Sequence, residues 1–171
     1  AVVTRSLAAT VLGLLASLAV LIAPAQGITT EAKQAIVVDA ETGTVLYEKN
    51  ARQQMAPSSM TKTLTAYVIF NALRAQQLTL DTEFTVSEKA WRRRGSTMWL
   101  ERGQKVSVKD LLIGLIVVSG NDAAIVLAEG FAGSEEEFAQ IMNATAVAIG
   151  MLDSNFVNAS GWPDEGHLST A

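Results

Sequence analysis

Residues 107–130, SVKDLLIGLIVVSGNDAAIVLAEG, contain two strongly apolar segments on either side of a short polar turn. Ser107 and Asp110 form a capping box ahead of the first apolar segment, and this pattern predicts a buried helix. The turn Ser119-Gly120-Asn121 ends that helix, and a second predicted helix starts at Asp122. We therefore expect a helical core in which the polar turn is held at a rigid, buried point.

Other segments predict a β-hairpin and two further helices. Two runs of strand-forming residues, 36–39 and 44–48, are separated by a turn that contains Gly43, and together they predict a β-hairpin. Residues 58–73 contain neither Gly nor Pro and carry apolar residues at near-helical spacing, which predicts a buried helix. A further helix is predicted between residues 134 and 150. One hairpin cannot form a stable sheet by itself, and several helices need a sheet or another layer to pack on, so we expect the strands that complete this domain to be missing at the C-terminus.

The first 27 residues have the pattern of a secretory signal peptide. Residues 7–22 contain no charge, Arg5 precedes them, and Ala23-Pro24-Ala25 follows at the spacing of a cleavage site. A membrane anchor is the alternative, because this apolar run is only a little shorter than the roughly 20 residues of a spanning helix. We expect residues 1–27 to be removed on export and residues 28–171 to form one catalytic or binding domain.

The composition excludes several classes of site. The chain has no cysteine, which rules out a disulfide framework, a thiol nucleophile and cysteine metal ligands. Residues 28–171 carry 12 basic and 17 acidic residues, and an acidic exported protein is a poor candidate for binding nucleic acid. The basic run Arg92-Arg93-Arg94 is predicted to be a solvated surface turn, because no interleaved aromatics or second patch accompany it.

Ser59 and Lys62 are the first candidate catalytic pair. They lie three residues apart at the start of a predicted helix, where such positions share a face. A lysine whose pKa is depressed by burial can serve as the base that makes a serine nucleophilic. The helix N-terminus adds backbone N–H groups that favour developing negative charge. The alternative is an ordinary first turn with a surface lysine, since this spacing arises by chance about once in a chain of this size.

Ser119 and Asn121 are the second candidate pair. A serine hydroxyl in the polar turn could relay a proton, and an asparagine amide could both donate to and accept from a peptide-like substrate. The alternative is a purely structural role, in which the turn ends one helix and one of the two side chains caps the next.

His167 is the only histidine, so a Ser-His-Asp triad would have to use it. It lies in a loop rich in Gly and Pro, and we expect a loop histidine with Ser169 or Thr170 as hydrogen-bond neighbours. A lone histidine without patterned carboxylates also argues against a zinc site, so no metal or cofactor is predicted.

Together, these features resemble the serine D-alanyl-D-alanine carboxypeptidases, which are low-molecular-mass penicillin-binding proteins of the β-lactamase/transpeptidase-like superfamily. The export signal, residues 57–62 and residues 118–123 carry the resemblance, which extends over about residues 33–171. Four further segments fit the family: residues 37–47, Gly95-Ser96-Thr97-Met98, residues 106–112 and Asn158-Ala159-Ser160-Gly161.

The resemblance implies an α+β fold, an antiparallel sheet flanked by helices plus a mostly helical subdomain, with the active site at their junction. It implies that Ser59 is the acylated nucleophile, that Lys62 is its general base and that Ser119 relays the proton to the departing D-alanine. Asn121 would bind the substrate, and the Ser59 backbone N–H would form half of the oxyanion hole.

The partners that the resemblance implies are the peptidoglycan stem pentapeptide ending in D-Ala-D-Ala and, as covalent inhibitors, β-lactams. The implied location is the periplasm or the outer face of the bacterial cytoplasmic membrane. The family's Lys-Thr-Gly strand, which binds the terminal carboxylate, does not occur in the 171 residues. We therefore expect this polypeptide to be a fragment without the C-terminal strands and with little or no turnover. Any membrane-associating C-terminal segment would also lie outside it.

Three alternatives remain open from the sequence. A DD-endopeptidase that cuts peptidoglycan cross-links would use the same groups. A class A β-lactamase would carry Asp at the position of Gly120, and the setting of Glu165 does not match the loop carboxylate of that family. A non-catalytic exported cell-wall module would use Ser59 and Lys62 only to cap and solvate a helix.

Overall fold

The computed structural model describes residues 27–171, and Lys33–Ala171 form one compact unit of helices with two small sheets. The predicted signal peptide, residues 1–27, lies outside the described residues except for Gly27. None of the helices between residues 27 and 171 has the length and hydrophobicity needed to span a lipid bilayer. The elements confirm the predicted α+β class.

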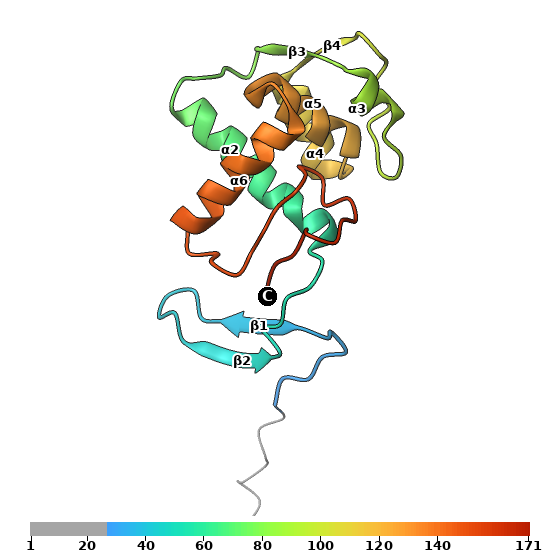
Figure 1. Ribbon diagram of the computed structural model, residues 1–171. Helices are drawn as coiled ribbons and strands as arrows, with labels where there is room; N and C mark the ends of the chain where they lie inside the picture. Colours follow the sequence, from blue (N-terminus) through green and yellow to red (C-terminus); the bar gives the residue numbers. More distant parts are fainter. Residues whose placement is uncertain (1–26) are drawn as a thin grey trace, which may run out of the picture. The chain divides into compact units, whose positions relative to one another are not determined.

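Four helices make the body of the molecule (Figure 1). Their bounds are Thr61–Arg74 for α2, Val108–Val117 for α4, Asn121–Ala132 for α5 and Glu135–Ala148 for α6. Helix α5 is the central element, since it contacts α2, α3, α4 and α6, and its residues 123–128 are all buried. All four helices were predicted from local patterns, although α5 starts one residue earlier than expected.

The predicted caps explain where two of these helices begin. Ser107 Oγ accepts a hydrogen bond from the Asp110 N–H, and Ser134 Oγ accepts one from the Glu137 N–H, each at 3.1 Å. Such caps satisfy N–H groups that have no partner within the helix, and each contributes about 1 kcal/mol. The start of α5 differs, because its cap residue Gly120 offers no side chain, so neither Ser119 nor Asn121 caps it as the alternative interpretation required.

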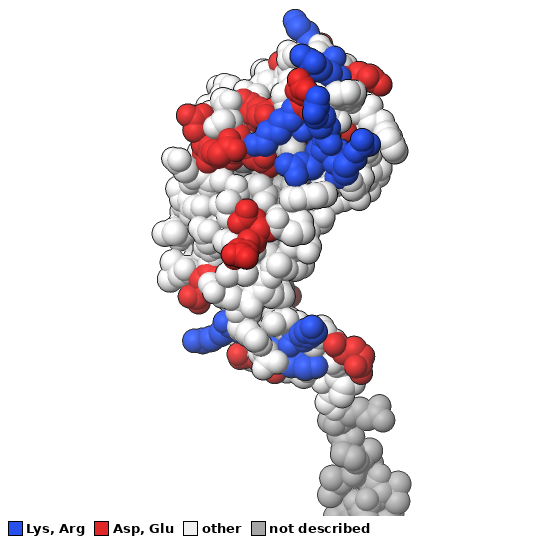
Figure 2. Space-filling model, turned by 45° about the vertical axis from the view of Figure 1, so that its right-hand side comes forward, with Lys and Arg blue, Asp and Glu red and all other residues white. Residues whose placement is uncertain are grey.

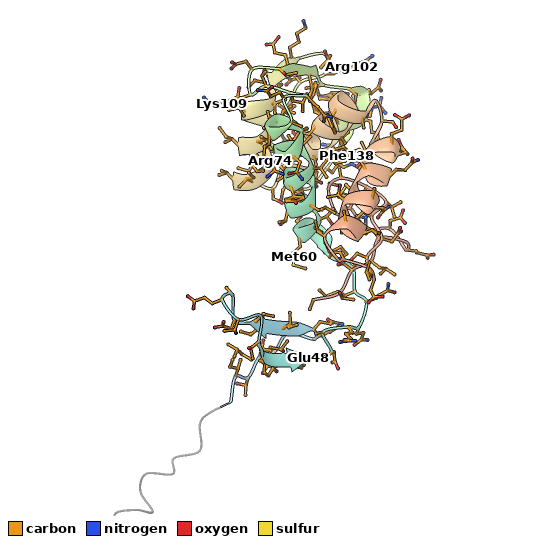
Figure 3. The ribbon with its side chains drawn as sticks, turned by 90° about the vertical axis from the view of Figure 1, so that its left-hand side faces the viewer. Glu48, Met60, Arg74, Arg102, Lys109 and Phe138 are labelled. Carbon is orange, nitrogen blue, oxygen red and sulfur yellow. The ribbon has the colours of Figure 1, made fainter. Side chains whose placement is uncertain are left out.

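The core lies between the four helices. Phe138 is fully buried and points inward among them, whereas Met60, just before α2, projects outward (Figure 3). The other large side chains with almost no exposed surface include Ile69, Leu111, Leu115, Ile125, Leu127 and Met142. Burying a side chain of this size stabilises the folded state by roughly 1.5–3 kcal/mol. This core fixes the first turn of α2 against the first turn of α5.

The two sheets are antiparallel pairs. Strands β1, Ala35–Val38, and β2, Val45–Lys49, form the predicted hairpin, in which the Asp39 carboxylate accepts hydrogen bonds from the turn. Strands β3, Glu83–Thr85, and β4, Lys105–Ser107, lie at one end of the helical body, with the short helix α3, Glu88–Arg92, between them in sequence (Figure 1). Phe84 of β3 fits against Gly130 of α5, where a Cβ would overlap its ring.

The last 20 residues return to the start of α2 (Figure 1). Ser169 pairs with Met55 and Leu168 pairs with Asn155 through isolated antiparallel bridges, and the Ala171 N–H donates to the Ala51 carbonyl. This return brings residues 158–167 against the short 3-10 helix η1, Ser58–Met60, that precedes α2.

Candidate active site

Ser59 and Lys62 lie together at the junction of η1 and α2. Ser59 is exposed, whereas Lys62 is only 5% exposed although its side chain is charged when protonated. The Lys62 Nζ atom donates three hydrogen bonds, to Ser59 Oγ at 3.1 Å, to Asn121 Oδ1 at 2.8 Å and to the Ser160 carbonyl at 2.8 Å. An ammonium has three N–H donors, so all of them have a partner here. The surface-lysine alternative is therefore excluded.

Burial lowers the pKa of Lys62 from 10.5 to about 8. The physical cause is desolvation, which penalises the ammonium relative to the neutral amine, and no carboxylate accepts a hydrogen bond from its Nζ atom. Near neutral pH the amine is thus deprotonated in an appreciable fraction of molecules. A neutral Nζ can accept the Ser59 hydroxyl proton, which an ammonium cannot do.

Asn121 connects the amine to the loop on the other side of the site. Its Oδ1 accepts from Lys62, and its Nδ2 donates to the Arg94 carbonyl at 2.9 Å. These two partners fix which end of the amide is oxygen. The next residue, Asp122, is buried and accepts hydrogen bonds from the Met98 and Leu100 N–H groups. The first turn of α5 therefore holds the 94–100 loop in place.

Ser119 lies beside the same opening. A cavity of about 470 Å³ is lined by Ser59, Lys62 and Ser119, with apolar walls from Tyr67, Phe70, Leu115 and Ile116. The Ser119 backbone has φ +57°, a conformation that non-glycine residues adopt at a cost and that recurs at functional sites. Within residues 27–171 its hydroxyl forms no hydrogen bond to Lys62. The structure thus brings Ser59, Lys62 and Asn121 into a bonded cluster and sets Ser119 on the wall of the adjoining cavity.

The Ser160 carbonyl is a member of this cluster that the sequence did not predict. Asn158 Oδ1 accepts hydrogen bonds from the Ser160, Gly161 and Trp162 N–H groups and so folds residues 158–162 into a tight turn. Gly161 has φ +79° and lies so close to η1 that a Cβ would overlap the Ser58 carbonyl. Only glycine fits there, and the close approach aims the Ser160 carbonyl at Lys62. The Asn-Ala-Ser-Gly turn signal could have located the turn but not its partner.

The prediction for His167 is wrong in its partners. His167 is buried, its Nε2 lies 2.8 Å from Thr61 Oγ1, and its Nδ1 accepts from the Val157 N–H at 3.1 Å. Burial lowers its pKa below 6.5, and because Nδ1 accepts a hydrogen bond, the neutral form of the ring carries its proton on Nε2. Ser169 instead pairs with Ser154. His167 anchors the C-terminal return to the start of α2 and does not contact Ser59.

Within the described part of the chain, no group of three or more His, Asp or Glu side chains is arranged to hold a metal ion. The chemistry that the cluster can support is acid–base chemistry at the Ser59 hydroxyl.

Residues 21–171 match the model of peptidase family S11, D-alanyl-D-alanine carboxypeptidase. The chain belongs to this family. The D-alanyl-D-alanine carboxypeptidase DacF of Bacillus subtilis is 41% identical over 141 residues, which are 82% of this chain and 36% of DacF. The chain thus spans a little more than a third of the length of this relative.

Solved structures of similar proteins agree with the fold. The D-alanyl-D-alanine carboxypeptidase DacD of Francisella tularensis is 41% identical with a TM-score of 0.83, over 88% of this chain and 36% of that one. Penicillin-binding protein D2 of Listeria monocytogenes, in its ampicillin-bound form, is 31% identical with a TM-score of 0.72, over 81% of this chain and 56% of that one. The resemblance seen in the sequence motifs is thereby confirmed, and the fold is that of the penicillin-binding proteins.

Proposed function

We propose that this S11 protein is a serine-type D-alanyl-D-alanine carboxypeptidase that removes the terminal D-alanine from peptidoglycan stem pentapeptides. The observation that carries the proposal is the buried Lys62 amine, 3.1 Å from the Ser59 hydroxyl and without a carboxylate to hold its proton. An amine in that state is a base for the alcohol beside it. The match to the D-alanyl-D-alanine carboxypeptidase family supports the proposed substrate class.

In this mechanism the neutral Lys62 Nζ accepts the Ser59 proton as Ser59 Oγ attacks the carbonyl carbon of the penultimate D-alanine. The Ser59 backbone N–H, at the start of a helix, donates to the developing oxyanion. The peptide C–N bond then breaks, the departing D-alanine nitrogen receives a proton through Ser119, and an ester to Ser59 remains. Asn121 positions the substrate. Water hydrolyses the ester and restores the Ser59 hydroxyl.

The proposal also covers reaction with β-lactams and the place where the enzyme acts. A β-lactam carbonyl would acylate Ser59 in the same way, and the ampicillin-bound relative from Listeria supports this part of the proposal. We assign residues 1–27 to a signal peptide and residues 28–171 to the N-terminal part of the catalytic domain. The enzyme would then act in the periplasm or at the outer face of the cytoplasmic membrane, where its substrate lies.

Covalent labelling by a fluorescent penicillin tests the proposal. We expect the protein, expressed at its native length, to be labelled once, and the Ser59→Ala variant to lose the label. Ser58→Ala is the matched control, because Ser58 lies in the same turn and its hydroxyl forms no hydrogen bond within the described residues. Labelling that survives in Ser59→Ala, or no labelling of the folded native protein, would contradict the proposal.

Product analysis separates the remaining alternatives. Purified uncross-linked muropeptides that end in D-Ala-D-Ala should release D-alanine, whereas preferential cleavage of cross-linked muropeptides would identify an endopeptidase. A labelled serine that loses the drug within seconds would instead identify a β-lactamase. The non-catalytic module predicts neither label nor product.

A further inference from the structure

The basic run at residues 92–94 is not surrounded by solvent alone. The Arg93 guanidinium carbon lies 4.9 Å from the centre of the Trp162 ring, which is the geometry of a cation–π contact. A surface hollow of about 220 Å³ is lined by Arg93 and Arg94 together with Trp91 and Trp99, and we call it the arginine hollow. Lysine and arginine side chains gather on this face (Figure 2). The sequence prediction of a plain solvated turn missed these aromatic neighbours.

Two guanidinium groups of this cluster have no acidic partner. Arg92 and Arg102 both pair with Glu88, and Lys89 pairs with Glu135 and Glu136. Within residues 27–171, neither Arg93 nor Arg94 forms an ion pair. Arg93 and Arg94 therefore carry charges that no ion pair neutralises, in a hollow whose lining also includes the carboxylates of Glu101 and Asp122.

The arginine hollow is joined to the nucleophile through a single side chain. Asn121 accepts from Lys62 with one end of its amide and donates to the Arg94 carbonyl with the other. The next residue, Gly95, has φ +88°, and a Cβ there would lie 2.8 Å from Asn121 Nδ2, so the loop is held tightly against the amide. The hollow is therefore two hydrogen bonds away from the Lys62 amine and is fixed in position relative to it.

We propose that the arginine hollow binds a carboxylate of the peptide substrate on the acyl-donor side of the scissile bond. This inference rests on the proposed carboxypeptidase function, in which the departing group is a single residue. A contact farther away than one residue must then come from the acyl-donor side.

The side chains of the hollow suit a carboxylate on an aliphatic stem. A guanidinium donates two parallel hydrogen bonds to a carboxylate, and the indole rings of Trp91 and Trp99 offer apolar faces to the carbon chain. Glu101 and Asp122 also line the hollow, and their negative charges disfavour a dense polyanion or an anionic membrane surface as the occupant. A single carboxylate within a peptide fits this mixed lining best.

A pair of synthetic substrates tests the inference. Two peptides end in D-Ala-D-Ala and differ only in one side chain or backbone group on the acyl-donor side, which is a free carboxylate in the first and its amide in the second. We expect kcat/KM of the native-length protein to be about tenfold higher for the carboxylate, as a charge-assisted hydrogen bond pair would give. The preference should fall as salt is raised from 20 to 300 mM, because the hollow is open to solvent.

The matched variants are Arg93→Gln/Arg94→Gln and Arg102→Gln. The double variant removes both unpaired guanidinium groups, and we expect its carboxylate-to-amide ratio to fall to about one. Arg102→Gln removes a charge from the same face but outside the hollow, and we expect its ratio to stay near ten. Each ratio compares two substrates on one preparation, so partial misfolding of a variant cancels.

The outcomes distinguish this inference from the function on which it rests. If neither peptide releases D-alanine and penicillin does not label Ser59, the proposed function fails and the inference fails with it. If both peptides are cleaved at equal rates, or if the double variant keeps the preference, only the arginine hollow assignment is overturned. The same holds if Arg102→Gln abolishes the preference, because the effect would then come from overall charge.

Discussion

The Lys62 amine donates a 2.8 Å hydrogen bond to Asn121 Oδ1, across 59 positions of sequence. This bond joins the first turn of α2 to the first turn of α5, and it orients the amine without supplying a negative charge. A carboxylate in the same place would stabilise the ammonium and keep the amine protonated. An amide positions the base while leaving its pKa low, near 8.

The first prediction concerns Lys62→Met, which keeps the length of the side chain and removes the base. We expect the rate of Ser59 acylation by a fluorescent penicillin to fall about 10²–10⁴-fold, the range that general base catalysis contributes. Lys109→Met, on the exposed face of α4, should acylate at the unaltered rate. Stopped-flow labelling measures both, and a Lys62→Met rate within threefold of the wild type would remove Lys62 from the mechanism.

The second prediction is the pH dependence of acylation. Only the neutral amine accepts the serine proton, so the rate should rise with pH and reach half of its maximum near pH 8, the lowered pKa of Lys62. An unperturbed lysine would place that midpoint near 10.5. The measurement is the second-order acylation rate constant between pH 6 and 10 at constant ionic strength.

The same pKa predicts how stability changes with pH. The folded-state pKa lies below the unfolded one, so between about pH 8 and 10.5 the unfolded chain binds more protons and stability rises with pH. The full effect is about 3 kcal/mol, by conversion of the shift at 1.36 kcal/mol per pH unit. The free energy of unfolding in urea should rise with pH across this window in the wild type and should lack this rise in Lys62→Met. If the two plots of unfolding free energy against pH were parallel, the lowered pKa of Lys62 would be contradicted.

The third prediction concerns Gly161→Ala. The added Cβ would overlap the Ser58 carbonyl, and backbone atoms cannot move aside without a large energetic cost. We therefore expect the free energy of unfolding to fall by about 3 kcal/mol or more and the Ser160 carbonyl to be displaced from Lys62. Gly150→Ala is the matched control, because its φ of +89° is similar but nothing lies within 4 Å of its Cβ. The control should lose only about 1–2 kcal/mol from the left-handed backbone. Equal losses in urea unfolding would show that the close approach is unimportant.

The fourth prediction concerns His167. Because burial depresses its folded pKa below 6.5, the unfolded state binds more protons just below pH 6.5, and stability should fall as pH drops from there through the folded pKa. His167→Gln should remove that part of the slope. Nitrogen-15 NMR at pH 7 should find the ring proton on Nε2, the tautomer that the Val157 N–H and Thr61 Oγ1 require. A proton on Nδ1 would refute the assigned anchoring role.

Local signals were sufficient for the four long helices and the hairpin, whereas the short helix α3, Glu88–Arg92, lies in a segment that the sequence predicted to be irregular. The caps at Ser107 and Ser134 and the turn at Gly43 each act within a few residues, so their effect can be predicted from sequence. The Ser59–Lys62 pair was equally accessible, since one helical turn fixes its spacing.

The errors concern partners that lie far apart in the chain. Thr61 and His167 are separated by 106 positions, and the sequence offered only neighbouring hydroxyls as candidates for the histidine. Arg93 likewise contacts Trp162, which lies 69 positions further along the chain, and no local pattern in the basic run predicts that contact. Such contacts depend on the path of the C-terminal return, which no local pattern specifies.

That return has a consequence for the order of events during biosynthesis. The Lys62 amine gains its last acceptor from Ser160, and the turn that carries Ser160 is secured by His167. A nascent polypeptide that has emerged only as far as residue 150 already contains Ser59, Lys62 and Asn121 but lacks the Ser160 carbonyl that accepts a hydrogen bond from the amine. Its lysine would lack one of its three acceptors, so the complete cluster forms only after residue 160 has been synthesised.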